Sequence, residues 1–218
     1  MSPGRETLRI TEIFHSIQGE SSQVGRPCSF VRLTGCNLRC AWCDTAYAFH
    51  GGEDMELDDI LRRVDSHGAS LVLVTGGEPL AQPGVHSLMT GLLHLGKEVM
   101  IETGGSLDIS GIDSRVRIIL DLKCPGSGME PKNCWENLKS LKPTDEIKFV
   151  LKDRSDYEWA RRVLRERRLE DHATVLFSPV FGVLDGRELA GWILQDRLKV
   201  RLQLQLHKLI WPPDMRGV

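Results

Sequence analysis

Residues 71–79 read LVLVTGGEP, four apolar residues followed by a threonine, two glycines, an acid and a proline. A short apolar run that ends in turn residues is typical of a strand buried on both faces. The two glycines would let a ligand approach the backbone closely, and Glu78 would add a carboxylate. The stretch therefore predicts a buried strand that opens onto a binding site at its carboxyl end, although a plain strand-to-helix turn is the alternative.

Apolar runs alternate with amphipathic stretches on both sides of this strand. Such alternation predicts a parallel sheet with covering helices, and about six βα steps fall short of the eight of a closed barrel. We expect an α/β fold of the incomplete TIM-type barrel, in a single domain over residues 1–218, because no linker divides the chain. The expected strands span 8–14, 29–33, 71–74, 98–101, 116–122, 146–151, 173–177 and 200–206, and the expected helices span 56–64, 85–93, 135–141, 156–167 and 186–195.

Polar and glycine-containing segments follow other expected strands as well. They lie at 102–105, 123–127 and 178–179. Because parallel strands place their carboxyl ends at one edge of the sheet, we expect these segments to share a pocket with residues 75–78.

Three cysteines, Cys36, Cys40 and Cys43, fall within eight residues that read CNLRCAWC. Iron–sulfur clusters normally take four cysteine thiolates, so three would leave one iron open to a non-protein ligand. Trp42 would give such a cluster an apolar wall. A zinc site completed by Cys28 or His50 is the alternative, but zinc usually uses paired Cys-x2-Cys units and the chain has one.

Further polar candidates precede the cysteines. Gln18 can donate and accept hydrogen bonds and Glu20 can accept them, which matches the edge of an aminopyrimidinone ring. The planar fork of Arg32 suits a carboxylate. On spacing alone, surface polar residues and an ordinary salt bridge remain open as alternatives.

The Cys-x3-Cys-x2-Cys spacing, with an aromatic residue before the last cysteine and a downstream GGEP segment, resembles the radical S-adenosylmethionine (SAM) enzymes. This resemblance implies an incomplete barrel, a [4Fe–4S] cluster, and SAM whose amino group is held by the GGEP loop.

A narrower resemblance extends from residue 14 to about residue 208. Ser-Ile-Gln-Gly-Glu at 16–20, Arg32 four residues before Cys36, Cys-Asp-Thr at 43–45 and Gln-Leu-His-Lys at 205–208 are similar to the 7-carboxy-7-deazaguanine synthase family. The resemblance implies conversion of 6-carboxy-5,6,7,8-tetrahydropterin to 7-carboxy-7-deazaguanine with loss of ammonia, in deazapurine or queuosine biosynthesis. It also implies a carbon–nitrogen lyase that uses SAM, [4Fe–4S] and Mg²⁺ and forms a homodimer.

The same resemblance assigns roles to individual residues. Cys36, Cys40 and Cys43 would hold the cluster, and Thr45 would place its hydroxyl on Mg²⁺. The expected catalytic residues are Glu20, Arg32, Thr45 and His207. The expected substrate contacts are Ile17, Gln18, Gly19, Glu20, Arg32, Thr75 and His207. The expected SAM contacts are Trp42, Asp44, Gly77, Glu78, Thr103, Lys123, Ser127, Ser178, Pro179, Val180 and Phe181.

Composition bounds the partners and the location. A formal net charge of −2 gives no electrostatic reason to expect nucleic acid, and no stretch has the apolar length of a membrane helix. The N-terminus lacks a secretory pattern, so we expect a cytoplasmic protein with reduced thiols. The expected partners are the small pterin substrate and an electron donor such as a flavodoxin.

Two competing functions remain at this point. A glycyl-radical activating enzyme would share the size, the cysteine spacing and the GGEP-like loop, but would not need residues 16–20 or Thr45. A small zinc-binding interaction module would carry zinc instead of iron.

Overall fold

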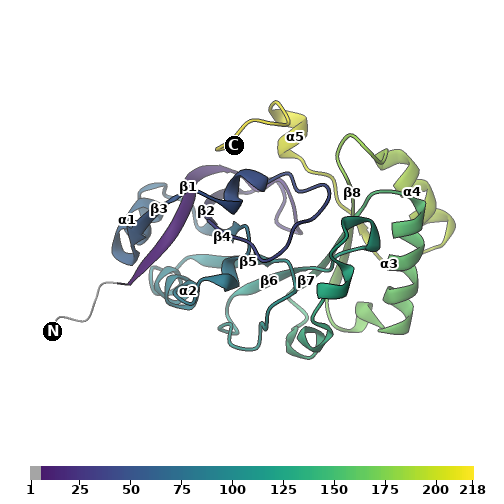
Figure 1. The fold of residues 1–218 in the computed structure, drawn as a ribbon, viewed down its shortest axis with the longest axis horizontal. Helices are drawn as coiled ribbons and strands as arrows, with labels where there is room; N and C mark the ends of the chain where they lie inside the picture. The colour runs from purple at the N-terminus through teal and green to yellow at the C-terminus, as the bar shows by residue number, and fades with distance from the viewer. Residues whose placement is uncertain (1–5) are drawn as a thin grey trace.

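Over residues 6–218, nine strands pair into one sheet, in the order β3-β1-β2-β4-β5-β6-β7-β8-β9 (Figure 1). A computed structural model describes residues 6–218 of the chain. Residues 1–5 lie outside the described residues. They belong to the expected domain and to the N-terminus that was expected to lack a secretory signal. Among the helices of the described part, none is long and apolar enough to cross a membrane.

Most of the sheet is parallel, and it does not close. The parallel strands are β2 (Pro27–Leu33), β4 (Leu71–Gly76), β5 (Glu98–Thr103), β6 (Arg117–Asp121), β7 (Glu146–Leu151), β8 (Thr174–Pro179) and β9 (Arg201–Leu202). Two strands at one edge, β1 (Thr7–Ile17) and β3 (Glu53–Glu56), are antiparallel to their neighbours. This open, mostly parallel sheet confirms the incomplete barrel.

The helices lie in two groups beside the sheet, with α1 and α2 near one end and α3 and α4 near the other (Figure 1). The α-helices are α1 (Leu57–Ser66), α2 (Val85–His94), α3 (Arg154–Glu166), α4 (Gly186–Gln195) and the short α5 (His207–Ile210). Six 3₁₀ segments connect the elements: η1 (Ala46–Phe49), η2 (Pro79–Ala81), η3 (Pro125–Ser127), η4 (Glu130–Lys132), η5 (Trp135–Ser140) and η6 (Leu169–Asp171).

Three sequence-based expectations were wrong in detail. Residues 135–141 form the 3₁₀ segment η5 rather than an α-helix. Edge strand β3 was not expected, because its sequence EDME has no apolar pattern. Of the expected strand 200–206, only Arg201 and Leu202 pair with β8. The Gln203 N–H makes a last hydrogen bond to Phe177 of β8 at 2.9 Å, while the Gln203 side chain accepts from the Ser21 N–H at 2.7 Å.

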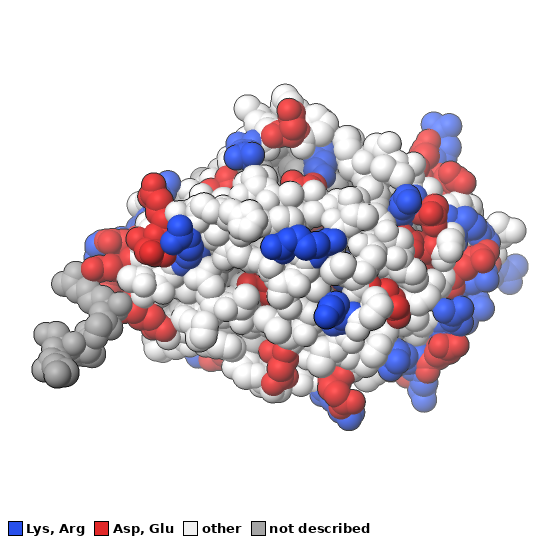
Figure 2. Space-filling view, in the orientation of Figure 1, with Lys and Arg blue, Asp and Glu red and all other residues white. Residues whose placement is uncertain are grey.

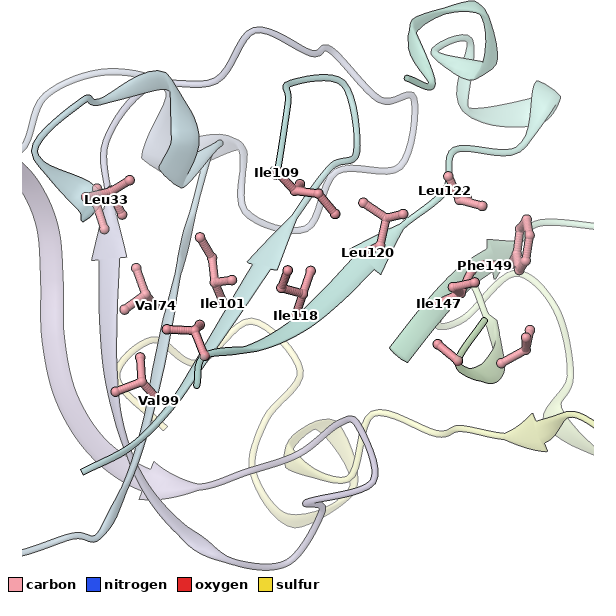
Figure 3. Close-up of a cluster of buried hydrophobic side chains, with 14 of the residues drawn as sticks. Leu33, Val74, Val99, Ile101, Ile109, Ile118, Leu120, Leu122, Ile147 and Phe149 are labelled. Carbon is pink, nitrogen blue, oxygen red and sulfur yellow. The ribbon is translucent and has the colours of Figure 1, made fainter. Parts of the chain in front are cut away.

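Alternate side chains of β2, β4, β5 and β6 enter two different cores. Val72 and Val74 of β4 pack on the helix side, together with the neighbouring strand residues drawn in Figure 3. Leu71 and Leu73 point to the other side, where a smaller cluster includes Met100. This smaller cluster also lines part of the cavity described below, because Leu73 belongs to both.

Candidate active site

A cavity of about 770 Å³ lies at the carboxyl ends of the parallel strands. Thr75 of β4, Thr103 of β5, Asp121 of β6 and Lys148 of β7 all line it. Residues 36–45, here called the cysteine loop, and parts of residues 203–218, here called the C-terminal segment, complete its wall. The C-terminal segment runs from the β8 side back over the strand ends (Figure 1). This is the edge at which parallel sheets carry their sites.

The structure brings most of the expected site residues to this one cavity. Four of the expected SAM contacts, Glu78, Ser127, Ser178 and Pro179, are buried and do not line it. The expected residues that do line it are Ile17, Gln18, Gly19, Glu20, Arg32, Cys36, Cys40, Trp42, Cys43, Asp44, Thr45, Thr75, Gly77, Thr103, Lys123, Val180, Phe181 and His207.

Glycine at position 77 lets the cysteine loop pack directly on the end of β4. A Cβ on Gly77 would lie 2.0 Å from the carbonyl oxygen of Gly35 and 2.9 Å from the Cβ of Cys36. The Glu78 N–H donates to the same Gly35 oxygen at 2.8 Å, and the Gly77 N–H donates to the Leu33 oxygen at 3.1 Å. Close packing within the chain therefore requires a glycine at position 77, whatever ligand it also meets.

Glu78 supports the wall from behind instead of facing the cavity. Its carboxylate accepts hydrogen bonds from the Leu80 N–H at 3.0 Å, the Gly104 N–H at 2.7 Å and the Thr103 hydroxyl at 2.9 Å. Burial raises the pKa of Glu78, and these hydrogen bonds act in the opposite direction. The side chain fixes Thr103 and Gly104, which lie at the cavity.

Ser127 anchors the cysteine loop. Its carbonyl oxygen accepts a hydrogen bond at 3.0 Å from the N–H of Ala41, the residue between Cys40 and Trp42. Its hydroxyl donates to the Cys124 carbonyl at 2.6 Å, so the 3₁₀ turn that presents it is itself fixed.

The cysteine donor set fits an iron–sulfur cluster. Cys36, Cys40 and Cys43 are free thiols, partly exposed, and all three line the cavity. Over residues 6–218, no three His, Cys, Asp or Glu side chains converge closely enough for a single metal ion. A cluster is bound through one thiolate per iron, so its ligands need not meet at one point.

An oxygen site for Mg²⁺ is available next to the cysteines. The Thr45 hydroxyl lines the cavity and donates to Asp44 at 2.9 Å. Asp44 also accepts from Lys208 at 2.7 Å and from Gln205 at 3.1 Å. Burial opposes its ionisation, but Lys208 and these hydrogen bonds hold the pKa of Asp44 well below its usual range. Hard oxygen atoms beside a lasting negative charge suit Mg²⁺.

A buried lysine organises the carboxylates at the base of the cavity. The Lys148 ammonium lies 2.8 Å from Glu20 and 3.6 Å from Asp121, and it also forms an ion pair with Glu102. Burial disfavours its charge, but the three carboxylates raise the pKa of Lys148 well above its usual range. Lys123 adds a second cation, 3.0 Å from Asp121.

Two carboxyl groups of this cluster are shifted in opposite directions. Burial raises the pKa of Glu20, but Lys148 and the Gln205 hydrogen bond outweigh it, so the net shift is downward. Burial raises the pKa of Glu102, and the nearby charges of Glu20 and Asp121 add to that rise despite Lys148. Glu102 is therefore the carboxyl group more able to hold a proton.

Sequence reasoning assigned no site role to Glu102, Asp121 or Lys148. The signal for Lys148 was a single lysine inside the apolar strand EIKFVL. Glu102 was included only in a polar segment that follows a strand. Asp121 lay inside an expected strand, and nothing in the sequence showed that its side chain would reach the cavity.

Arg32 sits at the cavity wall within an aromatic setting. Its Nε donates to Glu12 at 2.6 Å, and the Tyr47 hydroxyl donates to the same Glu12 oxygen at 2.8 Å. Phe14 and Phe30 stack with centroids 4.7 Å apart and also line the cavity. A flat apolar wall beside a guanidinium suits an aromatic or pterin-like ring that carries an anionic group.

Two buried polar atoms on cavity residues have no partner among the described residues. They are the Nε2 of Gln18, a donor, and the Oδ1 of Asp121, an acceptor. Buried polar groups are normally satisfied, so these two atoms are suited to a polar ligand.

Residues 30–166 match the family model of the Radical SAM superfamily, so the chain belongs to the radical SAM enzymes. Sequence relatives assign the chain to a narrower family within this superfamily. The 7-carboxy-7-deazaguanine synthase of Chlorobaculum tepidum is 47% identical over 214 residues, 97% of each chain. That of Koribacter versatilis is 46% identical over 226 residues, covering 97% of this chain and all of the relative. The chain is a member of the 7-carboxy-7-deazaguanine synthase family, which confirms the resemblance.

A solved structure supports the fold. QueE from Escherichia coli matches with a TM-score of 0.76 and 23% identity, over 92% of this chain and 95% of that one. Membership of the radical SAM superfamily implies a [4Fe–4S] cluster and SAM as cofactors, and the narrower family adds Mg²⁺.

Proposed function

We propose that the protein converts 6-carboxy-5,6,7,8-tetrahydropterin to 7-carboxy-7-deazaguanine with loss of ammonia, in 7-deazapurine or queuosine biosynthesis. The observation that carries this proposal is that the cysteine loop, residues 17–20 and residues 205–208 meet at one cavity. A glycyl-radical activating enzyme would need the cysteine loop but has no use for a small polar pocket built from residues 17–20.

The cysteine side of the cavity would hold the cofactors. Cys36, Cys40 and Cys43 would hold the cluster. When bound, the cluster and SAM supply the radical that removes a hydrogen atom from the substrate. We propose that the cavity residues Trp42, Asp44, Gly77, Thr103, Lys123, Val180 and Phe181 contact SAM, and that Glu78, Ser127, Ser178 and Pro179 support them from behind.

The opposite side would bind the pterin. Gln18 has a free amide donor, and Glu20 is an ionised acceptor, so together they fit the carbonyl and N–H groups of the aminopyrimidinone edge. Arg32 would bind the carboxylate and Thr45 would bind Mg²⁺. Ile17, Gly19, Thr75 and His207 would complete the substrate contacts, with Glu20, Arg32, Thr45 and His207 as the catalytic set.

The chain's own part in the reaction is to position groups and balance charge. The stacked rings of Phe14 and Phe30 would exclude water from one face of the pterin. Lys148 would keep Glu20 ionised for binding, while Glu102, with its raised pKa, is suited to exchange a proton at its carboxyl oxygen. Loss of ammonia requires proton transfer to nitrogen, so a carboxyl group of this kind is useful near the substrate.

We also propose an electron donor such as a flavodoxin, a homodimer and a cytoplasmic location. All six cysteines are free, which agrees with a reducing compartment. Leu194, Leu202 and Leu204 are exposed near the β9 edge, which agrees with a surface that another copy could cover.

The deciding experiment is an anaerobic product assay on reconstituted protein with SAM, a reductant, Mg²⁺ and the carboxylated pterin. We expect the ultraviolet absorbance of a deazaguanine product, and none from Cys40→Ala. If wild-type protein with full iron content cleaves SAM but forms no deazaguanine, the activating-enzyme alternative gains support. Thr45→Ala should keep the cluster spectrum and lose the stimulation by Mg²⁺.

A further inference from the structure

The last six residues, 213–218, form part of the cavity wall, and the assignments above use none of them. Figure 2 shows a hollow below the C-terminal segment at the top of the view, with both basic and acidic side chains around it. The segment is anchored before this point by the Lys208–Asp44 ion pair and by the Leu206 N–H, which donates to Gly19. It therefore reaches the mouth of the cavity in a defined direction.

Arg216 lies against the same aromatic ring as Arg32. Its guanidinium carbon is 4.0 Å from the centroid of the Tyr47 ring, and that of Arg32 is 5.9 Å from the same centroid. A guanidinium over an aromatic face is attracted to the negative face of the ring. Stacking leaves the in-plane N–H groups free to bind an anion.

The charged groups around Tyr47 are not paired equally. Glu12 accepts from both Arg32 and Tyr47, so its carboxylate is shared within the protein. Within residues 6–218, the structure records neither a hydrogen bond nor an ion pair for Arg216. Asp214 also lines the cavity, but over residues 6–218 the structure records no ion pair between it and Arg216, so the N–H groups of the Arg216 guanidinium remain available to an anionic ligand.

We propose that Arg216 is a specificity-determining residue that binds the carboxylate of the substrate together with Arg32. This inference rests on the proposed function, because that function supplies a substrate with a carboxylate. A carboxylate has about four acceptor positions on its two oxygens, so it can accept from two guanidinium groups at once. Binding by Arg216 also draws the C-terminal segment over the pterin.

The test compares two ligands on the reconstituted holoenzyme. One is the carboxylated pterin and the other is the same tetrahydropterin without the carboxylate, measured as a competitive ligand. Arg216→Gln should raise the Kd and KM of the carboxylated pterin about tenfold, because a hydrogen bond to a charged group is lost. The Kd of the uncarboxylated pterin and the KM for SAM should change less than about twofold, which lies within the context dependence of a single contact. Arg216→Lys should give an intermediate loss, because it keeps the charge but not the fork.

A matched control is Arg187→Gln, which changes an exposed arginine on α4 that does not line the cavity. It should change neither ligand's Kd. An equal rise in Kd for both pterins in Arg216→Gln would mean that Arg216 only holds the segment by stacking, and this would overturn the proposal. An unchanged Kd for both pterins would overturn it as well. If wild-type protein binds no carboxylated pterin, the proposed function fails. If it makes product and Arg216→Gln is unaffected, this inference alone fails.

Discussion

The cysteine loop and the C-terminal segment line the same cavity, but they are held in place by different interactions. The loop is fixed largely through backbone groups, with hydrogen bonds from the Glu78 N–H to Gly35, the residue before the loop, and from the Ala41 N–H to Ser127, although Asp44 at its end also pairs with Lys208. The C-terminal segment is fixed largely through side chains, among them Gln203, Gln205, Lys208 and Arg216. One wall depends on close backbone packing, and the other depends on charge.

This difference separates two tasks. Close backbone contacts respond little to salt or pH, so they suit a wall that must hold a cluster in one geometry. Ion pairs between partly exposed side chains contribute little each and are screened by salt. They suit a wall that closes on a small substrate and opens again. Substitutions that disturb the backbone contacts of the cysteine loop should therefore remove the cluster, and substitutions in the C-terminal segment should change mainly substrate binding.

The largest expected effect is that of Gly77→Ala. The new Cβ would lie 2.0 Å from the Gly35 carbonyl oxygen, so the cysteine loop has to move. We expect a loss of about 2–3 kcal/mol in the free energy of unfolding, as for an overpacked site, and a large drop in iron bound per chain. Iron analysis and urea denaturation measure both.

Gly191→Ala is the matched control for this change. Gly191 lies inside α4, and a Cβ there would meet no heavy atom within 4 Å. The change should leave iron content unaltered and stabilise the helix by about 0.5–1 kcal/mol. Full iron content in Gly77→Ala would show that the loop is not held by this contact.

Glu20→Gln should have the second largest effect, because Glu20 connects the base of the cavity to the C-terminal segment. The two oxygens of Glu20 accept hydrogen bonds from Lys148 at 2.8 Å and from Gln205 at 2.8 Å. The side-chain NH₂ of the new glutamine would replace one of these oxygens, so one of the two donors would lose its acceptor. We expect a loss of about 2 kcal/mol in stability and a raised KM for the pterin, with iron content unchanged. Glu136→Gln, at an exposed ion pair with Lys139, should cost less than about 0.5 kcal/mol. Loss of iron in Glu20→Gln would contradict the separation of the two walls.

Much of the fold could be predicted because its elements carry local patterns. Residues 146–151 and 186–195 match β7 and α4 at both ends. The helix begins there because the Asp185 side chain accepts from the Arg187 N–H at 2.7 Å. The alternating sequence of residues 200–206 misled the strand assignment, because beyond Gln203 the chain bonds to the β1–β2 loop, where the Leu206 N–H donates to Gly19 and Gln203 accepts from Ser21. That contact joins residues far apart in sequence.

The candidate site divides in the same way. The cysteines could be found because they lie close together in the sequence, and Thr45 was assigned by the resemblance. Lys148 reaches the cavity only through the folded sheet, where its one local sign is a lysine within an apolar strand. The resemblance assigned a SAM contact to Glu78. In the structure its fully buried carboxylate accepts hydrogen bonds from the Thr103 hydroxyl and the Gly104 N–H.

Lys208→Met should have a smaller effect, confined to the C-terminal segment. It removes the ion pair with Asp44, in which the Lys208 side chain is 9% exposed and that of Asp44 is 49% exposed, and a cation–π contact with Phe181 at 5.4 Å. Because the lysine is largely covered, we expect a loss of about 1 kcal/mol in stability, at the upper end for surface pairs. Hydrogen exchange of residues 205–211 should become faster, and high salt should produce part of the same change in the wild type. Lys199→Met, at an exposed lysine that does not line the cavity, should change neither. Faster exchange in the cysteine loop as well would show that the two walls are coupled.

The smallest expected effect is a pH dependence that comes from His207. Burial beside the β1–β2 loop lowers the pKa of His207, with Glu20 and Asp44 acting in the opposite direction and Lys208 and Arg32 adding to the drop. In the unfolded chain the pKa is about 6.5, so the unfolded state takes up the proton first as the pH falls. His207 therefore contributes its full stability above about pH 6.5, and that contribution declines below this pH until the pKa of the folded state is passed.

Comparison of the wild type with His207→Gln measures this contribution directly. The stability difference between the two proteins should shrink from pH 8 to pH 5.5, by a few tenths of a kcal/mol or more. The pKa of Glu20 and of Asp44 is lowered, so these neighbours stay ionised across that range. A difference that grows on acidification would mean that His207 gains a proton on folding. The C-terminal segment would then be held by a charged histidine paired with Glu20, and it would tighten in acid where we expect it to loosen.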